Sequence, residues 1–310
     1  MKYIIYIIFF FLYPFFVNNS GFAQEKKADS SNKKIDSVEK KIDSTQKTLG
    51  LTEKKILVTA PETIKEKKLE TKLQKRLYSF PQFLNETSLL IKQPTKWVPR
   101  DKIRFGIVIA ATLAVMPFDQ RITNSTQGHQ RYYYSAPVVG GRIYGEWYSI
   151  GAVAGVFGIY GLTVKDTAAK KIAIELLQAG LYSEFFTMIL KIAIGRERPI
   201  ATNDAFTYHP FSLWDYNFHS MPSGHTTSAF ALSTVMSRHA GSTALKILAY
   251  VPAGFTMFSR IYQHQHWLSD EILAAALGYF AGNWVVDLHE GRRHKINVTA
   301  LYPLGLSYSF

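Results

Sequence analysis

Three short stretches decide the fold and the chemistry of this 310-residue chain: KIAIGRERP at residues 191–199, PSGH at 222–225 and SRIYQHQHWLSD at 259–270. They bring together lysine, arginine, serine, histidine and aspartate side chains. A tetrahedral oxyanion such as a phosphate ester has use for all of these groups, because it needs fixed cations, backbone N–H groups, a nucleophile and a proton donor. The sequence therefore predicts a site for a phosphoryl group.

The first stretch predicts two cations at the exit of a helix. Lys191 and Arg198 are seven residues apart, or about two helical turns, so they share a face if the helix extends that far. Pro199 disfavours helical geometry at the residue before it. A helix that extends this far would therefore end before Pro199, with both cations at its exit.

The other two stretches predict helix starts. Ser223 is a suitable N-cap for the apolar run that begins at Thr226, and Gly224 lets a ligand approach the free N–H groups. His266 and Asp270 are four residues apart, as neighbours on one helical face are. A carboxylate there can accept from one ring nitrogen and leave the other facing phosphorus.

The three stretches resemble the signature of the type 2 phosphatidic acid phosphatase and vanadium haloperoxidase superfamily, K-x6-RP, PSGH and SR-x5-H-x3-D, at every defining position. The resemblance implies that His266 is a nucleophile held by Asp270, and that His225 protonates the leaving oxygen. It implies no metal or other cofactor. It also implies a set of residues that hold the phosphoryl oxygens: Lys191, Arg198, Ser223, Gly224 and Arg260. One departure is Gln265, since glycine is common in the residues before the nucleophile.

The rest of the chain predicts an all-α fold. Apolar runs without alternation predict six helices, and small residues within them favour close helix packing. The count resembles the family's six-helix bundle core. The expected helices are Ile103–Phe118, Trp147–Val164, Ala169–Ile194, Thr226–Arg238, Leu245–Phe258 and Trp267–Val286.

Four regions are expected along the chain. Residues 1–23 have the pattern of a signal peptide, although an uncleaved anchor is the alternative. Residues 24–76 are charged and poor in aromatics, which predicts a disordered tether. Residues 77–290 form the helical phosphatase domain. Residues 291–310 alternate around Pro303 and predict a C-terminal extension with a short β appendage.

Charge and cysteine content restrict the partners. The net charge is +13, much of it in the tether, and there is no cysteine, which excludes disulfides. We expect no nucleic-acid partner, because no recognisable binding motif accompanies the basic residues. Zinc binding by His264 and its neighbours is not expected, since the usual helical motif is missing.

Membrane association is expected, but two signals about topology conflict. Basic connections at Lys165, Lys170 and Lys246 lie opposite the catalytic stretches, which puts the site on the periplasmic side if the helices span a bilayer. A cleaved signal peptide followed by six spans would put the site in the cytoplasm. A soluble periplasmic bundle remains open, because several candidate helices are short for a span of about twenty residues.

Three alternatives to a lipid phosphatase remain. They are a vanadate-dependent haloperoxidase, a soluble acid phosphatase or phosphotransferase, and a non-catalytic envelope scaffold. Residues 203–220 are rich in aromatics and are interpreted either as a lid that contacts lipid or as a loop packed on the bundle. Glu175 and Glu184 are expected to be interhelical hydrogen-bond partners, and Asp119 and Arg121 a capping or ion-pair arrangement.

Overall fold

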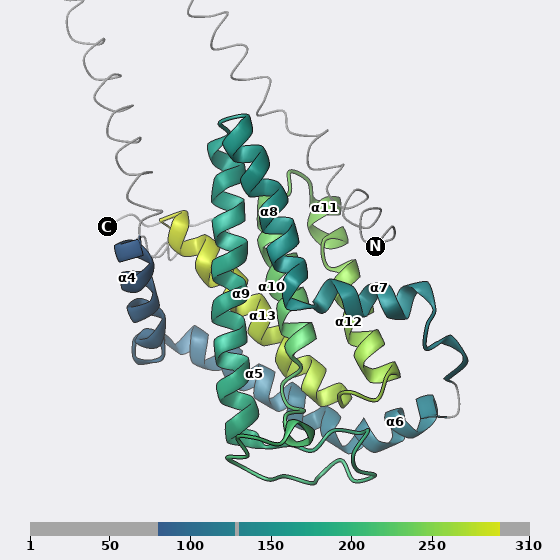
Figure 1. Cartoon of the computed structure of the whole chain (residues 1–310). Coiled ribbons are helices and arrows are strands. Elements are labelled where there is room, and N and C mark those ends of the chain that lie inside the picture. Colours follow the sequence, from purple (N-terminus) through teal and green to yellow (C-terminus); the bar gives the residue numbers. More distant parts are fainter. Residues whose placement is uncertain (1–79, 128–129, 292–310) are drawn as a thin grey trace, which may run out of the picture. The chain divides into compact units, whose positions relative to one another are not determined.

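The structure, a computed structural model, describes residues 80–127 and 130–291 (Figure 1). Most of these residues are helical, and the only extended pairing among them is an isolated bridge between Arg196 and Tyr208. The all-α prediction is therefore confirmed for this part of the chain. The predicted signal peptide, the tether and all but the first residue of the C-terminal extension lie outside the described residues.

The contacts divide the chain into two units, which are described separately. One unit ends at Trp97 and contains helix α4 (Phe80–Ile91) and the short 3-10 helix η1 (Gln93–Lys96). The other unit begins at Val98 and contains all three catalytic stretches.

The second unit is a helical bundle. In chain order its helices are α5 (Pro99–Val115), η2 (Met116–Phe118), α6 (Asp119–Gln127), η3 (Gln130–Tyr132), α7 (Ala136–Gly145), α8 (Trp147–Thr163), α9 (Thr167–Ile194), η4 (Tyr216–Phe218), α10 (Gly224–His239), α11 (Thr243–Leu248), α12 (Val251–Tyr262) and α13 (Leu268–His289). Helix α10 packs against α9 and α13, α8 packs along α9, and α7 packs on α12.

Close backbone contact between α10 and α13 fixes the centre of this unit. A Cβ atom at Gly278 of α13 would lie 2.2 Å from the carbonyl oxygen of Thr227, so only glycine allows this approach. Buried apolar side chains such as Leu232 and Val285 fill the surrounding space. The starts of α10 and α13 are thereby held side by side, and both carry catalytic stretches.

The six-helix prediction is only partly matched. Five expected helices correspond to α5, α8, α9, α10 and α13, but the expected helix Leu245–Phe258 is two helices, α11 and α12. Pro252 sits in the first turn of α12, where its missing N–H group is tolerated. Helix α7 was not expected, and it packs on α12 and α10. A six-helix core is therefore not confirmed.

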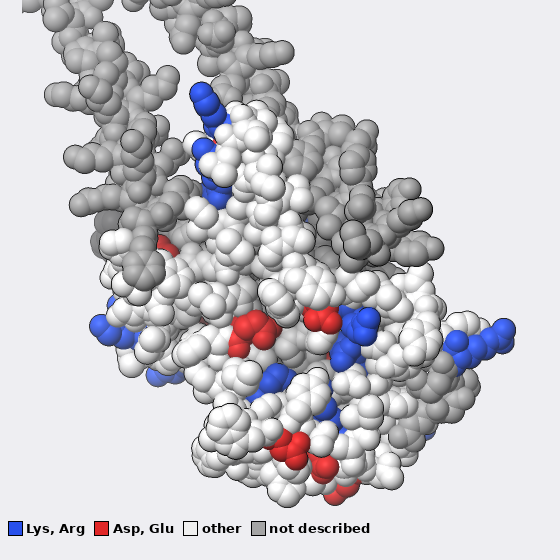
Figure 2. Space-filling model, in the orientation of Figure 1, with Lys and Arg blue, Asp and Glu red and all other residues white. Residues whose placement is uncertain are grey.

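Two segments are long and apolar enough to cross a membrane: Pro99–Thr126, which is mostly exposed, and Thr167–Ile194, which is about half buried. On the face shown in Figure 2, the surface over α8 and α9 is largely uncharged below the basic side chains at their connecting turn. Farther down this face, acidic and basic side chains gather close together. On this face, the uncharged surface thus lies between the basic turn and a second charged region.

Candidate active site

Lys191 lies one turn from the end of α9, and its side chain is buried. The helix ends at Ile194 because Gly195 adopts a left-handed conformation, with φ of 61°. A Cβ atom there would lie 1.8 Å from the carbonyl oxygen of His209, so the position requires glycine. The end expected for this helix, Ile194, is therefore matched, but the helix does not extend to Arg198, and the two cations do not share a helical face.

Arg198 reaches the same place from the loop that follows. Its Nη2 donates to the carbonyl oxygen of His219 at 3.0 Å, and Nζ of Lys191 donates to the same oxygen at 2.7 Å. The guanidinium also lies over the ring of Tyr216, 3.9 Å from its centre. The two cations therefore meet as predicted, but through a shared carbonyl group and not through a shared helical face.

The start of α10 matches the prediction. Ser223 is the N-cap, and its hydroxyl accepts from the backbone N–H of Thr226 at 3.4 Å. Gly224 is the first residue of the helix. The free N–H groups of this turn point to the same end of the bundle as Lys191, whose side chain lies near Gly224. A helix start of this kind favours an anion.

Arg260 comes from the last turn of α12 and is almost fully buried. Its Nη1 donates to the side chain of Gln263 at 2.8 Å, while its Nε has no hydrogen-bond partner among the described residues. A buried donor without a partner is costly unless a ligand satisfies it. Arg260 is thus available to hold an oxyanion.

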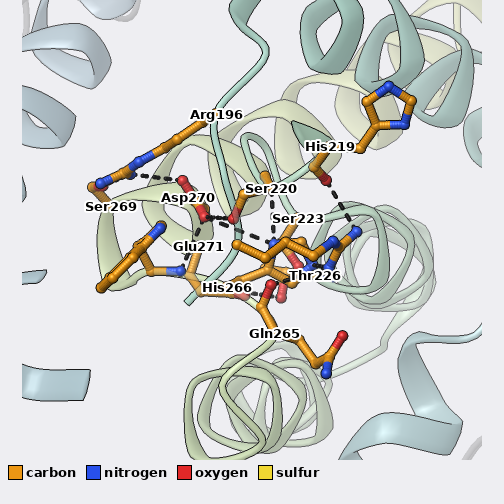
Figure 3. A network of polar contacts seen from close by, with 12 residues as sticks. Arg196, His219, Ser220, Ser223, Thr226, Gln265, His266, Ser269, Asp270 and Glu271 are labelled. Carbon is orange, nitrogen blue, oxygen red and sulfur yellow. Dashed lines mark hydrogen bonds and ion pairs between the residues drawn. The ribbon is translucent and has the colours of Figure 1, made fainter. Parts of the chain in front are cut away.

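His266 occupies the loop between α12 and α13 and is buried (Figure 3). Its Nδ1 lies 2.7 Å from the carbonyl oxygen of Ser220, which can only accept, so Nδ1 carries the proton. Its Nε2 is therefore unprotonated and accepts a hydrogen bond from Nη1 of Arg198 at 3.2 Å. Burial lowers the pKa of His266 well below its usual value, and the charges of Arg198 and Lys191 lower it further.

The relationship between His266 and Asp270 differs from the prediction. His266 precedes α13, which begins at Leu268, so the two residues do not share a helical face. The carboxylate Oδ2 lies 3.7 Å from Nδ1 of His266, beyond hydrogen-bond distance. Instead, the Ser220 hydroxyl donates to Oδ2 at 2.5 Å, and the Ser220 carbonyl accepts from His266. Ser220 therefore links the two side chains.

Arg196 is a site residue that sequence reasoning missed. Its side chain is fully buried, and Nη1 donates to Oδ1 of Asp270 at 2.8 Å. Its Nη2 donates to Asp119 at 2.8 Å, and the carbonyl oxygen of Ala205 accepts from both Nε and Nη2. Asp119 also accepts from the backbone and hydroxyl of Ser269. Asp119 is thus ion-paired, but its partner is Arg196 and not the neighbouring Arg121, and this pair supports Asp270.

The remaining predicted residue, His225, lies in the first turn of α10 and is partly exposed. Its Nε2 is 3.2 Å from the carboxylate Oε1 of Glu146, a residue outside the three stretches. The cations of Arg260 and Lys191 interact electrostatically with its ring. His225 in turn interacts with His266, so both histidines belong to one cluster.

Two other acidic residues behave as expected. Glu175 pairs with His239 and His289 on α10 and α13, toward the opposite end of α9. Glu184 accepts from the Ser228 hydroxyl at 2.5 Å. Both link helices, as the sequence predicted.

In the site, buried cations lie close to a neutral histidine and to the start of α10. This arrangement is suited to a tetrahedral oxyanion. A sequence model of the PAP2 superfamily matches residues 173–294, which contain all three catalytic stretches. This part of the chain belongs to the PAP2 superfamily. The resemblance seen in the motifs is confirmed.

A curated relative and two solved structures are similar to this chain. Lipid A 1-phosphatase of Porphyromonas gingivalis is 40% identical over 74 residues, covering 22% of this chain but only 17% of the relative. LpxE of Aquifex aeolicus aligns with 19% identity and a TM-score of 0.42, over 55% of this chain and 95% of that one. A transmembrane PAP2 type phosphatidylglycerolphosphate phosphatase from Bacillus subtilis aligns with 19% identity and a TM-score of 0.48, over 60% of this chain and 94% of that one.

Proposed function

We propose that this protein is a metal-independent phosphatase that cleaves a phosphate monoester or pyrophosphate on a lipid through a phosphohistidine. One observation carries the proposal: the unprotonated Nε2 of buried His266 faces Arg198, in a cluster with Lys191 and Arg260. A neutral imidazole is a nucleophile, and fixed cations can bind and polarise the phosphoryl oxygens that it attacks.

In the first step, Nε2 of His266 forms a bond to phosphorus while the bond from phosphorus to the ester oxygen breaks. The electron pair of that bond leaves with the oxygen, and His225, as imidazolium, gives it a proton. Lys191, Arg198 and Arg260, together with Ser223 and the N–H group of Gly224, hold the equatorial oxygens. These side chains supply the positive charge that other phosphatases obtain from metal ions.

In the second step, water attacks phosphorus and transfers a proton to His225, which is now neutral. The bond between phosphorus and Nε2 breaks, phosphate leaves, and both histidines return to their starting states. While His266 carries the phosphoryl group its ring is cationic. Asp270, 3.7 Å from Nδ1 and linked to it through Ser220, stabilises that charge.

A lipid substrate fits the surface around the site. The relative from Porphyromonas gingivalis is named for lipid A. In addition, the segment between Arg198 and His219 exposes several large hydrophobic residues, including Ile200, Phe206 and Trp214. Two segments long enough to cross a membrane support membrane association. We place the active site on the periplasmic side, because the opposite end of α9 is basic: Lys165 lies in the turn before it, and Lys170 and Lys171 lie in its first turns.

The test is phosphate release by the purified full chain from lipid A, phosphatidic acid, phosphatidylglycerolphosphate, undecaprenyl pyrophosphate and a soluble monoester, with and without detergent. We expect release from at least one lipid and none by the His266→Ala variant. A radiolabelled, acid-labile protein adduct that is lost in that variant would support the phosphohistidine. Halide oxidation with vanadate and peroxide in place of phosphate release would contradict the proposal, as would wild-type activity in the variant.

A further inference from the structure

Glu146 is the single residue between α7 and α8, and its carboxylate contacts the proton donor of the proposed reaction. Its Oε1 lies 3.2 Å from Nε2 of His225. About a quarter of each side chain is exposed, 24% for His225 and 25% for Glu146. Glu146 precedes the matched segment, which begins at residue 173, and it belongs to none of the three stretches. Neither the motifs nor the comparisons give it a role.

The position of Glu146 is fixed by close packing on its N-terminal side. A Cβ atom at Gly145 would lie 2.5 Å from a methyl group of Thr256 and 2.7 Å from the carbonyl oxygen of His225. The hydroxyl of Thr256 donates to the carbonyl oxygen of Gly141 at 2.7 Å, which holds α7 on α12. The end of α7 therefore rests directly on the first turn of α10. The packed backbone next to Glu146 therefore places its carboxylate beside His225, so the position of the carboxylate does not depend on a flexible surface contact.

The contact with Glu146 opposes the effect that burial and the nearby cations have on the pKa of His225. Burial lowers the pKa of His225, and the cations Arg260 and Lys191 lower it further, which disfavours the imidazolium form. The hydrogen bond to Glu146 opposes these effects. The pKa of Glu146 is itself lowered, chiefly by His225 and to a smaller extent by Arg142 and Arg260. Glu146 is thus the carboxylate that balances the cations near the proton donor.

We propose that Glu146 is the positioning residue of the proton donor: it accepts a hydrogen bond from Nε2–H of His225, orients the ring and stabilises its protonated form. Nδ1 of His225 then carries the proton that passes to the leaving oxygen. The bond between phosphorus and that oxygen breaks with its electron pair on the oxygen, and the proton on Nε2 stays with His225. This inference rests on the proposed phosphatase function.

The experiment compares wild type with Glu146→Gln on two soluble phosphate esters. An alkyl phosphate needs a proton on its leaving oxygen, whereas p-nitrophenyl phosphate releases a stable anion and needs it much less. General acid catalysis contributes about 10²–10⁴-fold, so we expect kcat on the alkyl ester to fall about tenfold or more, with a much smaller loss on the aryl ester. The alkaline limb of the alkyl-ester pH profile should move to lower pH, because His225 then loses its proton more easily.

Glu290→Gln is the matched control. Glu290 is a partly buried, ion-paired glutamate that contacts Arg238 at 2.7 Å, near the end of α13 away from its catalytic start. This variant should leave both rates and the pH profile unchanged. Glu146→Asp, which keeps the charge but shortens the side chain, should retain more alkyl-ester activity than Glu146→Gln. Thermal unfolding of each variant verifies that it is folded.

A titration by NMR of labelled histidines separates this inference from the proposed function. The His225 signal, assigned with a His225→Asn variant, should titrate at lower pH in Glu146→Gln than in wild type. That shift would support the contact even if the wild type released no phosphate, in which case the proposed function alone would fail. An unchanged titration, or equal losses on both esters with an unmoved pH profile, would overturn the inference.

Discussion

Nη1 of Arg196 donates to Oδ1 of Asp270 at 2.8 Å, and neither side chain is exposed to solvent. The same guanidinium also binds Asp119, so one cation serves two buried carboxylates. The second oxygen of Asp270 accepts from Ser220, which in turn holds His266 through its carbonyl group. Arg196 therefore orients the proposed nucleophile, His266, without touching it, because Asp270 and Ser220 lie between the two side chains and connect them.

Replacing Arg196 with methionine should be strongly destabilising. The change leaves Asp119 and Asp270 buried without their cation, and breaking a buried ion pair in this way costs about 3–5 kcal/mol. Thermal or denaturant unfolding measures the loss. Arg238→Met is the control, because its partners Asp287 and Glu290 are partly exposed and such pairs contribute about 0–1 kcal/mol. Equal stability of the Arg196 variant and wild type would contradict this interpretation of the network.

Replacing His266 with alanine should abolish phosphate release while the protein stays folded. The substitution removes the only side chain that bonds to phosphorus in the proposed mechanism. His264→Asn is the matched control: His264 lies two residues away, contacts Thr126, and has φ of 54°, a conformation that asparagine tolerates. The control should keep activity, measured as phosphate released per unit time. Loss of activity in both variants to the same extent would point to a local folding defect.

Glu271 should make stability depend on pH. Burial raises the pKa of Glu271 to about 8, and the neighbouring charge of Asp270 acts in the same direction, against the hydrogen bond from Thr226. Because the folded protein binds this proton more tightly than the unfolded chain does, stability falls as pH rises from the ordinary glutamate pKa toward about 8. Glu271→Gln removes this contribution, so its Tm should fall less than that of wild type between pH 5 and about 8.5. Parallel Tm curves for the two proteins would rule out the effect.

The loop of residues 203–220, which is rich in aromatic residues, offers a test of membrane contact. Trp214 is 94% exposed and Phe211 is 77% exposed, which excludes for these two residues the interpretation that the loop packs on the bundle. Trp214→Ala should change the free energy of unfolding by less than about 0.5 kcal/mol. It should weaken binding to phospholipid vesicles and lower activity on lipid, but not on a soluble ester.

Trp284→Ala is the matching core variant, since Trp284 is only 4% exposed and packs against Tyr182. Removing a buried tryptophan costs about 3–5 kcal/mol. Vesicle binding is measured by flotation or tryptophan fluorescence. Unchanged binding and unchanged lipid activity of the Trp214 variant would show that the loop does not contact the bilayer.

The residue types in the cage were predictable because chemistry restricts them and their order in the chain. Lys191, Arg198, Ser223, Arg260 and His266 all reach the cluster that the motifs indicated. Sequence spacing could not predict which structural element brings each side chain to the cluster. The left-handed Gly195 ends α9 at Ile194, and pairing of Arg196 with Tyr208 directs the following loop, so Arg198 reaches the site from a loop and not from a helix.

The supporting residues were harder to predict, because each acts through a contact made far away in the sequence. Arg196 stands two positions before Arg198, and a second arginine in so short a segment was the only local signal. Glu146 is a single carboxylate between two apolar runs, which indicates a helix boundary but says nothing of His225. Helix α7 was not predicted because its glycines lower the helical propensity, and tertiary packing on α12 overrides that preference.

Asp119 and Glu146 both precede residue 173, yet one pairs with Arg196 behind Asp270 and the other with His225. A chimera that grafts only residues 173–294 onto another scaffold would therefore leave behind the acidic partners of Arg196 and His225. Exchange of catalytic modules between such proteins should place its upstream junction before the start of α6.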